Sequence, residues 1–515
     1  MKNSYFLVIP KQKSAPARLK EFEPKVLEQW IAELPIANPL MATRLFYEYV
    51  TDLNTIKMPA QQRLDVLELL RSSYITVEDY LRSELIKSGF PKEESDKKHL
   101  ALLAALEKSV TLSYWIILKE LTGHDIGWFQ GKSVALSIQR CIKGLSSIVM
   151  SYFMMGMPIP DWIWMDLHSL YKLSVKIKKN TTQVVVNDVN SINKTSSPEE
   201  CYLQVILLSL ANPTGLMQKE IKLVYDLIET IYSLVSLKNV VVAGQVVQCV
   251  IFTDEDKPPF FEAGEDTDAD SLKLYLDLTN LYHAFEQGDI PVSESESRFS
   301  TRHVVKNYAE KPTLELLEYL KQRWSGISLQ SALLFNDRLD RYLAIGLTST
   351  FKLQKAIATT SEDQLEFLVE SLSNRLLSCV FKKTGLLSVG SLVSFRRIDI
   401  PEHKRFLGIV DIIIVEKEEG KISFGVQLLA HQSIAVTYLP INATRHDQPK
   451  QALLYKTLEP EGSSYIITDT FILKENDIVR LFINQDDFPI ILKNKKNIGL
   501  GYWQFECLKV TEKRK

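Results

Sequence analysis

Cysteine is scarce in this sequence, and its distribution excludes two common kinds of site. The 515 residues include five cysteines, at positions Cys141, Cys201, Cys249, Cys379 and Cys507. They are odd in number and widely spaced, and none forms a Cys-x-x-Cys pair or a Cys/His metal-ligand spacing. This pattern predicts reduced thiols in the cores of a cytoplasmic protein, and it argues against a disulfide framework or a zinc site.

An excess of charge of either sign is also lacking. The 61 basic and 63 acidic residues give a formal net charge of −2, so no overall field draws the chain to nucleic acid or to an anionic membrane. The most apolar stretch, 145–165, is interrupted by Pro158, Pro160 and Asp161, and no run of about 18 apolar residues occurs. The first 20 residues contain no signal-peptide core. We therefore expect no nucleic-acid binding and no membrane insertion.

Enzyme signatures are absent as well. The sequence contains no GxxxxGK[ST], GxGxxG, GxSxG or HExxH motif. The eight histidines are far apart, and the acidic stretch 254–271 lacks the spacing of a calcium loop. We expect this stretch to be a solvated linker, the protein to hold no metal, and the chain not to be an enzyme.

What the sequence does contain begins with helices. Between about 17 and 237 the apolar residues recur at helical spacing, as Val26, Trp30 and Leu34 do. The stretch 197–200, Ser-Pro-Glu-Glu, combines a capping serine, a first-turn proline and acidic residues at the positive end of a helix. Repeated helix–turn–helix units favour a repeat-like array, although no clean 34-residue signature is present. We assign residues 1–237 to a helical, repeat-like domain.

The second half of the chain is mostly strand. After a mixed segment, 238–334, short alternating runs separated by turn signals such as "EEGK" and "PEGSS" favour an antiparallel barrel or sandwich. A helical insertion is expected at 361–380. We place a barrel at 335–440 and a small β-rich domain, or an extension of the barrel, at 441–515. The fold class is α+β multidomain, with an N-terminal helical region followed by an antiparallel β-barrel.

Several arginines flank these strands. Arg338 and Arg341 precede a strand, where guanidinium groups are able to hold a phosphate with two hydrogen bonds. Further basic side chains stand in an upstream loop and around a turn of the β-rich part: Arg298, Arg302, Arg396, Arg397, Lys404 and Arg405. The alternative for each of them is an ordinary surface charge.

The order of the strands carries a family resemblance. The stretch from about 335 to 440 resembles a PilZ domain, a six-stranded barrel of bacterial proteins, many of which bind cyclic di-GMP. The better-matched part has three strands, which carry Gly390 and Val393, then Gly408 and Val410, then Gly425, Val426 and Leu428. The long helical front is also similar to bacterial proteins in which helices precede a PilZ-like end.

The resemblance implies a nucleotide site and also shows where this chain departs from it. The family uses R-x-x-x-R before the first strand, and Arg338-x-x-Arg341 is one residue short. The family also uses [DN]-x-S-x-x-G after the second strand, and the matching stretch, 380–385, keeps only Gly385. Val380 is unable to hydrogen-bond a guanine, although Lys382 and Lys383 would attract a dianion. The implied site consists of Arg338, Arg341, Lys382, Lys383 and Gly385.

Two functions follow from these observations. The first is a bacterial signalling effector, in which the barrel binds cyclic di-GMP and the helical region passes the signal to a protein partner. The second is a scaffold or adaptor that works without a nucleotide, since helical repeats commonly bind other proteins. An enzyme is the third and weakest reading, because nothing in the sequence supports it.

Overall fold

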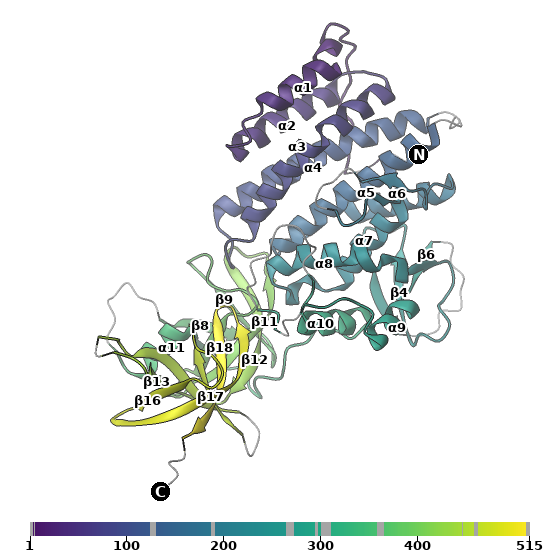
Figure 1. Ribbon diagram of the computed structural model, residues 1–515. Helices are drawn as coiled ribbons and strands as arrows, with labels where there is room; N and C mark the ends of the chain where they lie inside the picture. Colours follow the sequence, from purple (N-terminus) through teal and green to yellow (C-terminus); the bar gives the residue numbers. More distant parts are fainter. Residues whose placement is uncertain are drawn as a thin grey trace.

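The computed structural model describes residues 4, 6–123, 130–186, 191–263, 272–293, 297–299, 311–357, 365–444, 446–457 and 462–510. The molecule is elongated, with the helices at one end and the β-barrels at the other (Figure 1). The helical front and the barrels that were expected from the sequence are confirmed, and the fold is α+β. Arg302 lies outside the described residues.

The helical region stacks long helices side by side. Its helices are α1 (Pro24–Glu33), α2 (Pro39–Thr55), α3 (Ala60–Leu85), α4 (Glu94–Leu121), α5 (Gly131–Met154), α6 (Ile163–Lys176), α7 (Pro198–Leu210) and α8 (Gln218–Ile231). The predicted start of α7 is confirmed, because the Ser197 hydroxyl accepts from the Glu200 amide while the Glu200 carboxylate accepts from the Ser197 amide. This reciprocal cap satisfies two amides that a helix start would otherwise leave unpaired.

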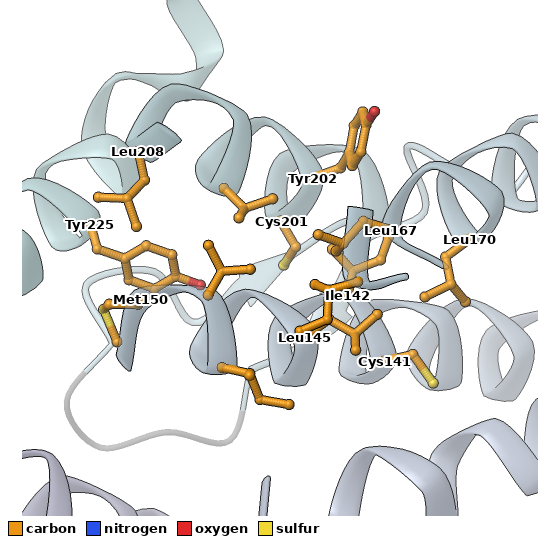
Figure 2. Close-up of a cluster of buried hydrophobic side chains, with 14 of the residues drawn as sticks. Cys141, Ile142, Leu145, Met150, Leu167, Leu170, Cys201, Tyr202, Leu208 and Tyr225 are labelled. Carbon is orange, nitrogen blue, oxygen red and sulfur yellow. The ribbon is translucent and has the colours of Figure 1, made fainter. Parts of the chain in front are cut away.

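Two of the predicted core thiols lie in the middle of this region. Cys141 and Cys201 are fully buried among leucines, isoleucines and tyrosines (Figure 2). The five cysteines are free, and only Cys507 is partly exposed. Burial raises the pKa of Cys141 and Cys201 above the ordinary thiol value, so both are uncharged packing residues.

Helix α4 contains a long apolar stretch. Within the part of the chain that the structure describes, it is the one helix whose length and composition would allow it to cross a membrane, and 67% of its apolar window is buried inside the protein. It packs against α2, α3 and α5. A central helix needs an apolar surface of this kind on most sides, so the packing accounts for its composition.

A small sheet lies beside the helices. Its strands are β3 (Ser236–Lys238), β4 (Val247–Phe252), β5 (Phe260–Ala263) and β6 (Lys273–Asp277), in the order β3-β6-β4-β5. A separate two-stranded ribbon joins β1 (Val184–Val185) to β2 (Thr195–Ser196). Helices α9 (Thr279–Gln287) and α10 (Leu314–Trp324) follow the sheet. The Trp324 indole donates to the carbonyl of Leu207 at 2.9 Å, which fixes α10 to α7.

Two closed barrels of six antiparallel strands follow in the chain. The first contains β7 (Arg341–Ile345), β8 (Phe367–Ser371), β9 (Leu376–Val380), β10 (Leu392–Arg397), β11 (Phe406–Val415) and β12 (Lys421–Ala430), with α11 (Leu347–Gln354) after β7. The second contains β13 (Ser433–Pro440), β14 (Lys450–Lys456), β15 (Ser464–Thr468), β16 (Ile478–Ile483), β17 (Asp486–Gly499) and β18 (Tyr502–Lys509). Only two residues separate β12 from β13, so the strand at 433–440 belongs to the second barrel and not to the first.

The helix expected at 361–380 is wrong. This stretch supplies β8 and β9, and the side chains of β8 alternate between buried and exposed positions. Leu365, Leu368 and Leu372 do stand at helical spacing, but pairing of β8 with β7 and of β9 with β12 closes the barrel and decides the structure. The helix that is inserted in this barrel is α11, nearer the start.

The barrels pack against each other through a shared apolar layer. Leu392, Leu407 and Ile409 of the first barrel meet Ala435 and Leu453 of the second. The turn before β10 is also bonded to the second barrel, since the Leu500 amide donates to the Gly390 carbonyl at 2.8 Å. The segment 297–299 lies against the same region, because the Asn497 side chain donates to the Phe299 carbonyl at 2.9 Å.

Two glycines of the first barrel allow other chain segments to approach it closely. A β-carbon at Gly408 would stand 2.4 Å from a methyl of Val426 on the neighbouring strand. One at Gly425 would stand 1.6 Å from the hydroxyl oxygen of Ser331 and 2.6 Å from a carboxylate oxygen of Asp411. Ser331 donates to Asp411 at 2.7 Å, so the segment before β7 crosses the barrel wall at Gly425.

We expect Gly425→Val to destabilise the first barrel by about 1–3 kcal/mol, because the added side chain would displace Ser331 from this crossing. The free energy of unfolding would be measured by urea denaturation. Gln427→Ala is the control, since Gln427 lies on the same strand but is exposed. An unchanged free energy of unfolding in Gly425→Val would contradict the close approach.

Candidate functional site

The two halves of the predicted nucleotide site lie at opposite ends of the first barrel. Arg341 starts β7, pairs with Val369 of β8 and donates to Ser371, the last residue of β8, and this end of the barrel also holds Arg338. Lys382, Lys383 and Gly385 follow β9, whose last residue, Val380, pairs with Lys421 at the other end. Strand β9 alone spans five residues, or roughly 13 Å at about 3.3 Å per residue. We call the first end the arginine end and the second the docked end.

Arg341 is the best-anchored residue of the arginine end. It is 2% exposed, and its guanidinium donates to the Leu339 carbonyl, to the Ser371 hydroxyl at 2.6 Å and to Asp337 at 2.6 Å. The guanidinium carbon also lies 3.4 Å from the centre of the Phe335 ring, which adds a cation–π contact. The alternative that Arg341 is an ordinary surface charge is therefore wrong, and its replacement would affect folding.

Accessible cations at this end include Arg338, Arg397 and Lys404 of the β10–β11 loop. Arg338 is exposed, and no partner is recorded for it among the described residues. Arg397 stands opposite Arg341 across the β7–β10 pairing and makes a surface ion pair with Asp399 at 2.6 Å. The hydrogen bond from Arg341, assisted by the nearby charge of Arg397, holds the pKa of Asp337 below its ordinary value.

A second group of arginines on the same barrel is bound by one carboxylate. Arg396 and Arg405 both donate to Glu366, and Arg396 does so through two of its nitrogens at 3.0 and 2.8 Å. Burial alone would raise the pKa of Glu366, but the hydrogen bonds from the two arginines outweigh it and keep that pKa below the ordinary value. Arg405 is 1% exposed and also donates to the Ser394 hydroxyl. This group stabilises the fold and has little freedom to bind a ligand.

The docked end joins the barrel to the helical region. The Gly385 amide donates to the Pro91 carbonyl at 2.9 Å, and the backbones of Phe90 and Leu387 exchange two hydrogen bonds at 2.6 and 2.9 Å. Gly385 has a φ of +70°, a conformation that favours glycine, and it turns the chain towards this contact. Lys382 and Lys383 on the same loop are exposed. The glycine that matches the family motif thus holds two domains together in this structure.

The upstream arginine of the "RFSTR" stretch has a structural role. Arg298 donates to Glu220 of α8 at 3.0 and 2.5 Å and to the Gly215 carbonyl at 2.9 Å. Its guanidinium also lies over the ring of Tyr319, 4.9 Å from the ring centre. Arg298 therefore anchors the segment before the barrel to the helices, and we expect its replacement to disturb the structure. Lys404 is exposed.

Sequence reasoning missed the two carboxylates that organise these arginines. Asp337 stands four residues before Arg341, a spacing that would have indicated a local ion pair. Glu366 is 30 residues from Arg396 and 39 from Arg405, and no local pattern connects them. Across the described ranges, no group of three or more His, Cys, Asp or Glu side chains is arranged to hold a metal ion.

Comparisons with known proteins agree with the architecture. Residues 25–240 match the family described as the N-terminal domain of the cyclic-di-GMP receptor FimW. The curated FimW of Pseudomonas aeruginosa is 24% identical over 306 residues, which is 59% of this chain and 49% of that protein. The chain is similar to FimW over this length. No solved structure matches it.

The similarity to FimW covers only part of each protein. The chain spans about half of the length of FimW, and the matched domain ends before the first barrel begins at Arg341. The resemblance to a cyclic di-GMP receptor that the barrel suggested is confirmed by the match to FimW. FimW is described as a receptor, which agrees with the prediction that this chain is not an enzyme.

Proposed function

We propose that this chain is a cyclic di-GMP receptor that acts in signalling, with its nucleotide site at the arginine end of the first barrel. The observation that carries the proposal is the relationship to FimW over 59% of the chain. The match to FimW and the PilZ-like barrel both point to proteins associated with the same nucleotide. The arginine end is favoured over the docked end because it offers guanidinium groups, which hold a phosphate with two parallel hydrogen bonds, whereas the Gly385 amide at the docked end is bonded to Pro91.

The geometry supports a mechanism in which a phosphate of the nucleotide replaces the Asp337 carboxylate on Arg341. Cyclic di-GMP carries two phosphates, and arginine holds a phosphate with two parallel hydrogen bonds. Arg338 is exposed and able to reach a ligand directly. The carboxylate of Asp337, which is partly exposed, occupies one nitrogen of Arg341 at 2.6 Å. A phosphate that replaced this carboxylate would bind both arginines and release Asp337.

The test is a calorimetric titration of the full chain with cyclic di-GMP. We expect micromolar or tighter binding by the wild type, and an affinity reduced by about tenfold or more in Arg338→Ala, since a charged hydrogen bond is worth roughly 1.5–3 kcal/mol. Folding is expected to survive this change, because Arg338 is exposed. Arg341→Ala is expected to weaken both binding and stability.

Two controls locate the site. Lys382→Ala/Lys383→Ala removes two exposed cations at the docked end, and Arg480→Ala removes an exposed arginine of the second barrel. Both variants are expected to bind within about a factor of two of the wild type. A large loss in the lysine variant would move the site to the docked end. If the wild type gives no heat of binding at about 50 µM nucleotide, the receptor proposal fails.

The route by which the signal leaves the barrel is part of the proposal. We assign this role to the helical region, which would present the surface for a protein partner. Its support is the backbone bridge between Phe90 and Leu387, since a change in the barrel is able to reach the α3–α4 loop through it. The measurement is hydrogen exchange of residues 86–93 with and without nucleotide, and unchanged exchange there would contradict this route.

A nucleotide-independent scaffold is the second candidate. The observation that favours it is the environment of Arg341, whose donors already bind Leu339, Ser371 and Asp337. In that case Arg341 is a structural residue and the barrel binds a protein. The same titration separates the two functions.

A further inference from the structure

A polar cavity lies inside the helical region, far along the chain from the barrels. It is bounded by side chains of α3, α4, α5 and α8 and has a volume of about 70 Å³. A water molecule needs roughly 10–15 Å³ of such space, so the cavity has room for about five water-sized groups, which is the size of a tetrahedral oxyanion. Lys222 and Asp226, 37% and 36% exposed, line the cavity and connect it to the solvent.

Most charges in the cavity wall are paired with each other. Lys222 binds Asp226 at 2.6 Å, Lys143 binds Glu229 at 2.8 Å, and Arg140 binds Glu68 at 2.8 Å. Arg82 forms ion pairs with the nearby carboxylates of α3 and α4, namely Glu78, Asp79 and Glu107. The carboxylates around the cavity are therefore already engaged by other cations.

Arg71 is the exception. It lines the cavity and is 8% exposed, and its Nε donates to the Val186 carbonyl at 3.1 Å. No carboxylate is bonded to it within the described ranges, and no partner is recorded there for its two terminal nitrogens. The Glu68 carboxylate acts on Arg71 through its charge but is hydrogen-bonded to Arg140. An anion beside the terminal nitrogens of Arg71 would therefore make hydrogen bonds that no described residue makes.

The protonation of a neighbouring carboxyl favours an anion here. Burial, followed by repulsion from Glu78, raises the pKa of Glu107 well above the ordinary value. A carboxyl with a raised pKa carries less negative charge at a given pH than an ordinary carboxyl, so the negative charge around Arg82 is reduced. The electrostatic opposition to an entering anion is smaller than the number of carboxylates suggests.

We propose that this cavity is a binding site for a small oxyanion, a free phosphate or the phosphate group of a small metabolite, with Arg71 as its principal ligand. The planar fork of the two terminal nitrogens suits a phosphate oxygen pair. The Ser147 and Ser191 hydroxyls, which also line the cavity, add polar surface. This site is separate from the arginine end of the barrel and does not depend on cyclic di-GMP binding.

The experiment titrates the full chain with inorganic phosphate at constant ionic strength in a chloride buffer. We expect one saturable site in the wild type and binding that is about tenfold weaker or undetectable in Arg71→Gln. Arg44→Gln is the matched control, since Arg44 is an exposed arginine of the same region, and it is expected to bind like the wild type. Acetate at the same concentration is the second arm, and we expect it to compete weakly.

A third variant keeps the test decisive if Arg71→Gln does not fold. Arg71→Lys retains the charge but loses the fork, so it is expected to fold and to bind phosphate more weakly than the wild type. Cyclic di-GMP binding, measured on the same samples, is expected to stay unchanged. The proposal is overturned if the wild type shows no saturable phosphate binding, or if Arg71→Gln and Arg71→Lys bind phosphate as well as Arg44→Gln.

Discussion

Replacement of Arg82 by methionine is expected to lower the free energy of unfolding by about 3–5 kcal/mol at neutral pH. Arg82 of α3 is buried, and it donates to Glu78 of the same helix at 2.5 Å and to Glu107 of α4 at 2.8 Å. Removing it leaves two buried carboxyl groups without a cation. The loss comes chiefly from this unpaired charge and less from the contacts of the arginine itself.

The same loss should depend on pH. In the wild type, burial pushes the pKa of Glu78 upwards, but the charge of Arg82 outweighs burial and holds that pKa below its ordinary value. Without Arg82, burial raises the pKa of both carboxyls in the folded state. A carboxyl with a raised folded pKa destabilises the protein above that pKa, and the destabilisation disappears as the pH falls through it. We therefore expect the gap between Arg82→Met and the wild type to be larger at pH 8 than at pH 5.

Urea denaturation at the two pH values measures this gap. Arg44→Met is the matched control, because it removes an exposed arginine from the same region and is expected to change stability by less than about 0.5 kcal/mol. A loss of equal size at pH 5 and pH 8 would show that packing, and not buried charge, is the main role of Arg82.

The second large effect is expected for Phe90→Ala. Phe90 comes from the loop between α3 and α4, is 7% exposed, and belongs to the apolar core of the first barrel. Beside it lies an apolar pocket of about 390 Å³, lined by Phe153, Met157 and Val415 among others, so the space left by the ring would not be refilled. Truncation of a buried phenylalanine costs about 3–5 kcal/mol.

This loss should separate the helical region from the barrels. We expect calorimetric unfolding of Phe90→Ala to show two transitions in place of one, because the contact that couples the two parts is weakened. Phe471→Ala, which truncates a phenylalanine that is 73% exposed, is the control and is expected to unfold like the wild type. One unshifted transition in Phe90→Ala would mean that the backbone bridge alone couples the domains.

Local signals in the sequence predicted the parts of this fold that local interactions determine. The start of α7 followed from Ser197, Pro198 and Glu200, because a helix cap is made by neighbours in the chain. The β12 glycine, Gly425, was recognised from its family pattern, but its structural reason, the crossing of Ser331, involves a segment 94 residues away. Contacts at that separation leave no periodicity to detect.

The same distinction explains what was missed. The stretch 361–380 carries a helical stripe, and the barrel pairs that override it join β8 to β7 and β9 to β12. For the candidate site, the sequence identified Arg338 and Arg341 but was unable to show that Lys382, Lys383 and Gly385 would lie at the other end. The reversal of direction between consecutive strands decides that placement, and it becomes visible only once the register is known.

The contact between the turn at Gly390 and the second barrel has a consequence for synthesis on the ribosome. Gly390 accepts from Leu500, and the carbonyl of Phe299 accepts from Asn497. The helical region is able to fold as soon as it emerges, since its core lies within its own residues and those that follow closely. The first barrel has all of its strands by residue 430. The turn at Gly390 and the segment 297–299, however, lack these hydrogen-bond partners until β17 has left the ribosome. A nascent chain therefore passes through an interval in which the first barrel is closed but exposes the layer that β13 and β14 will cover, and chaperone binding is expected in that interval.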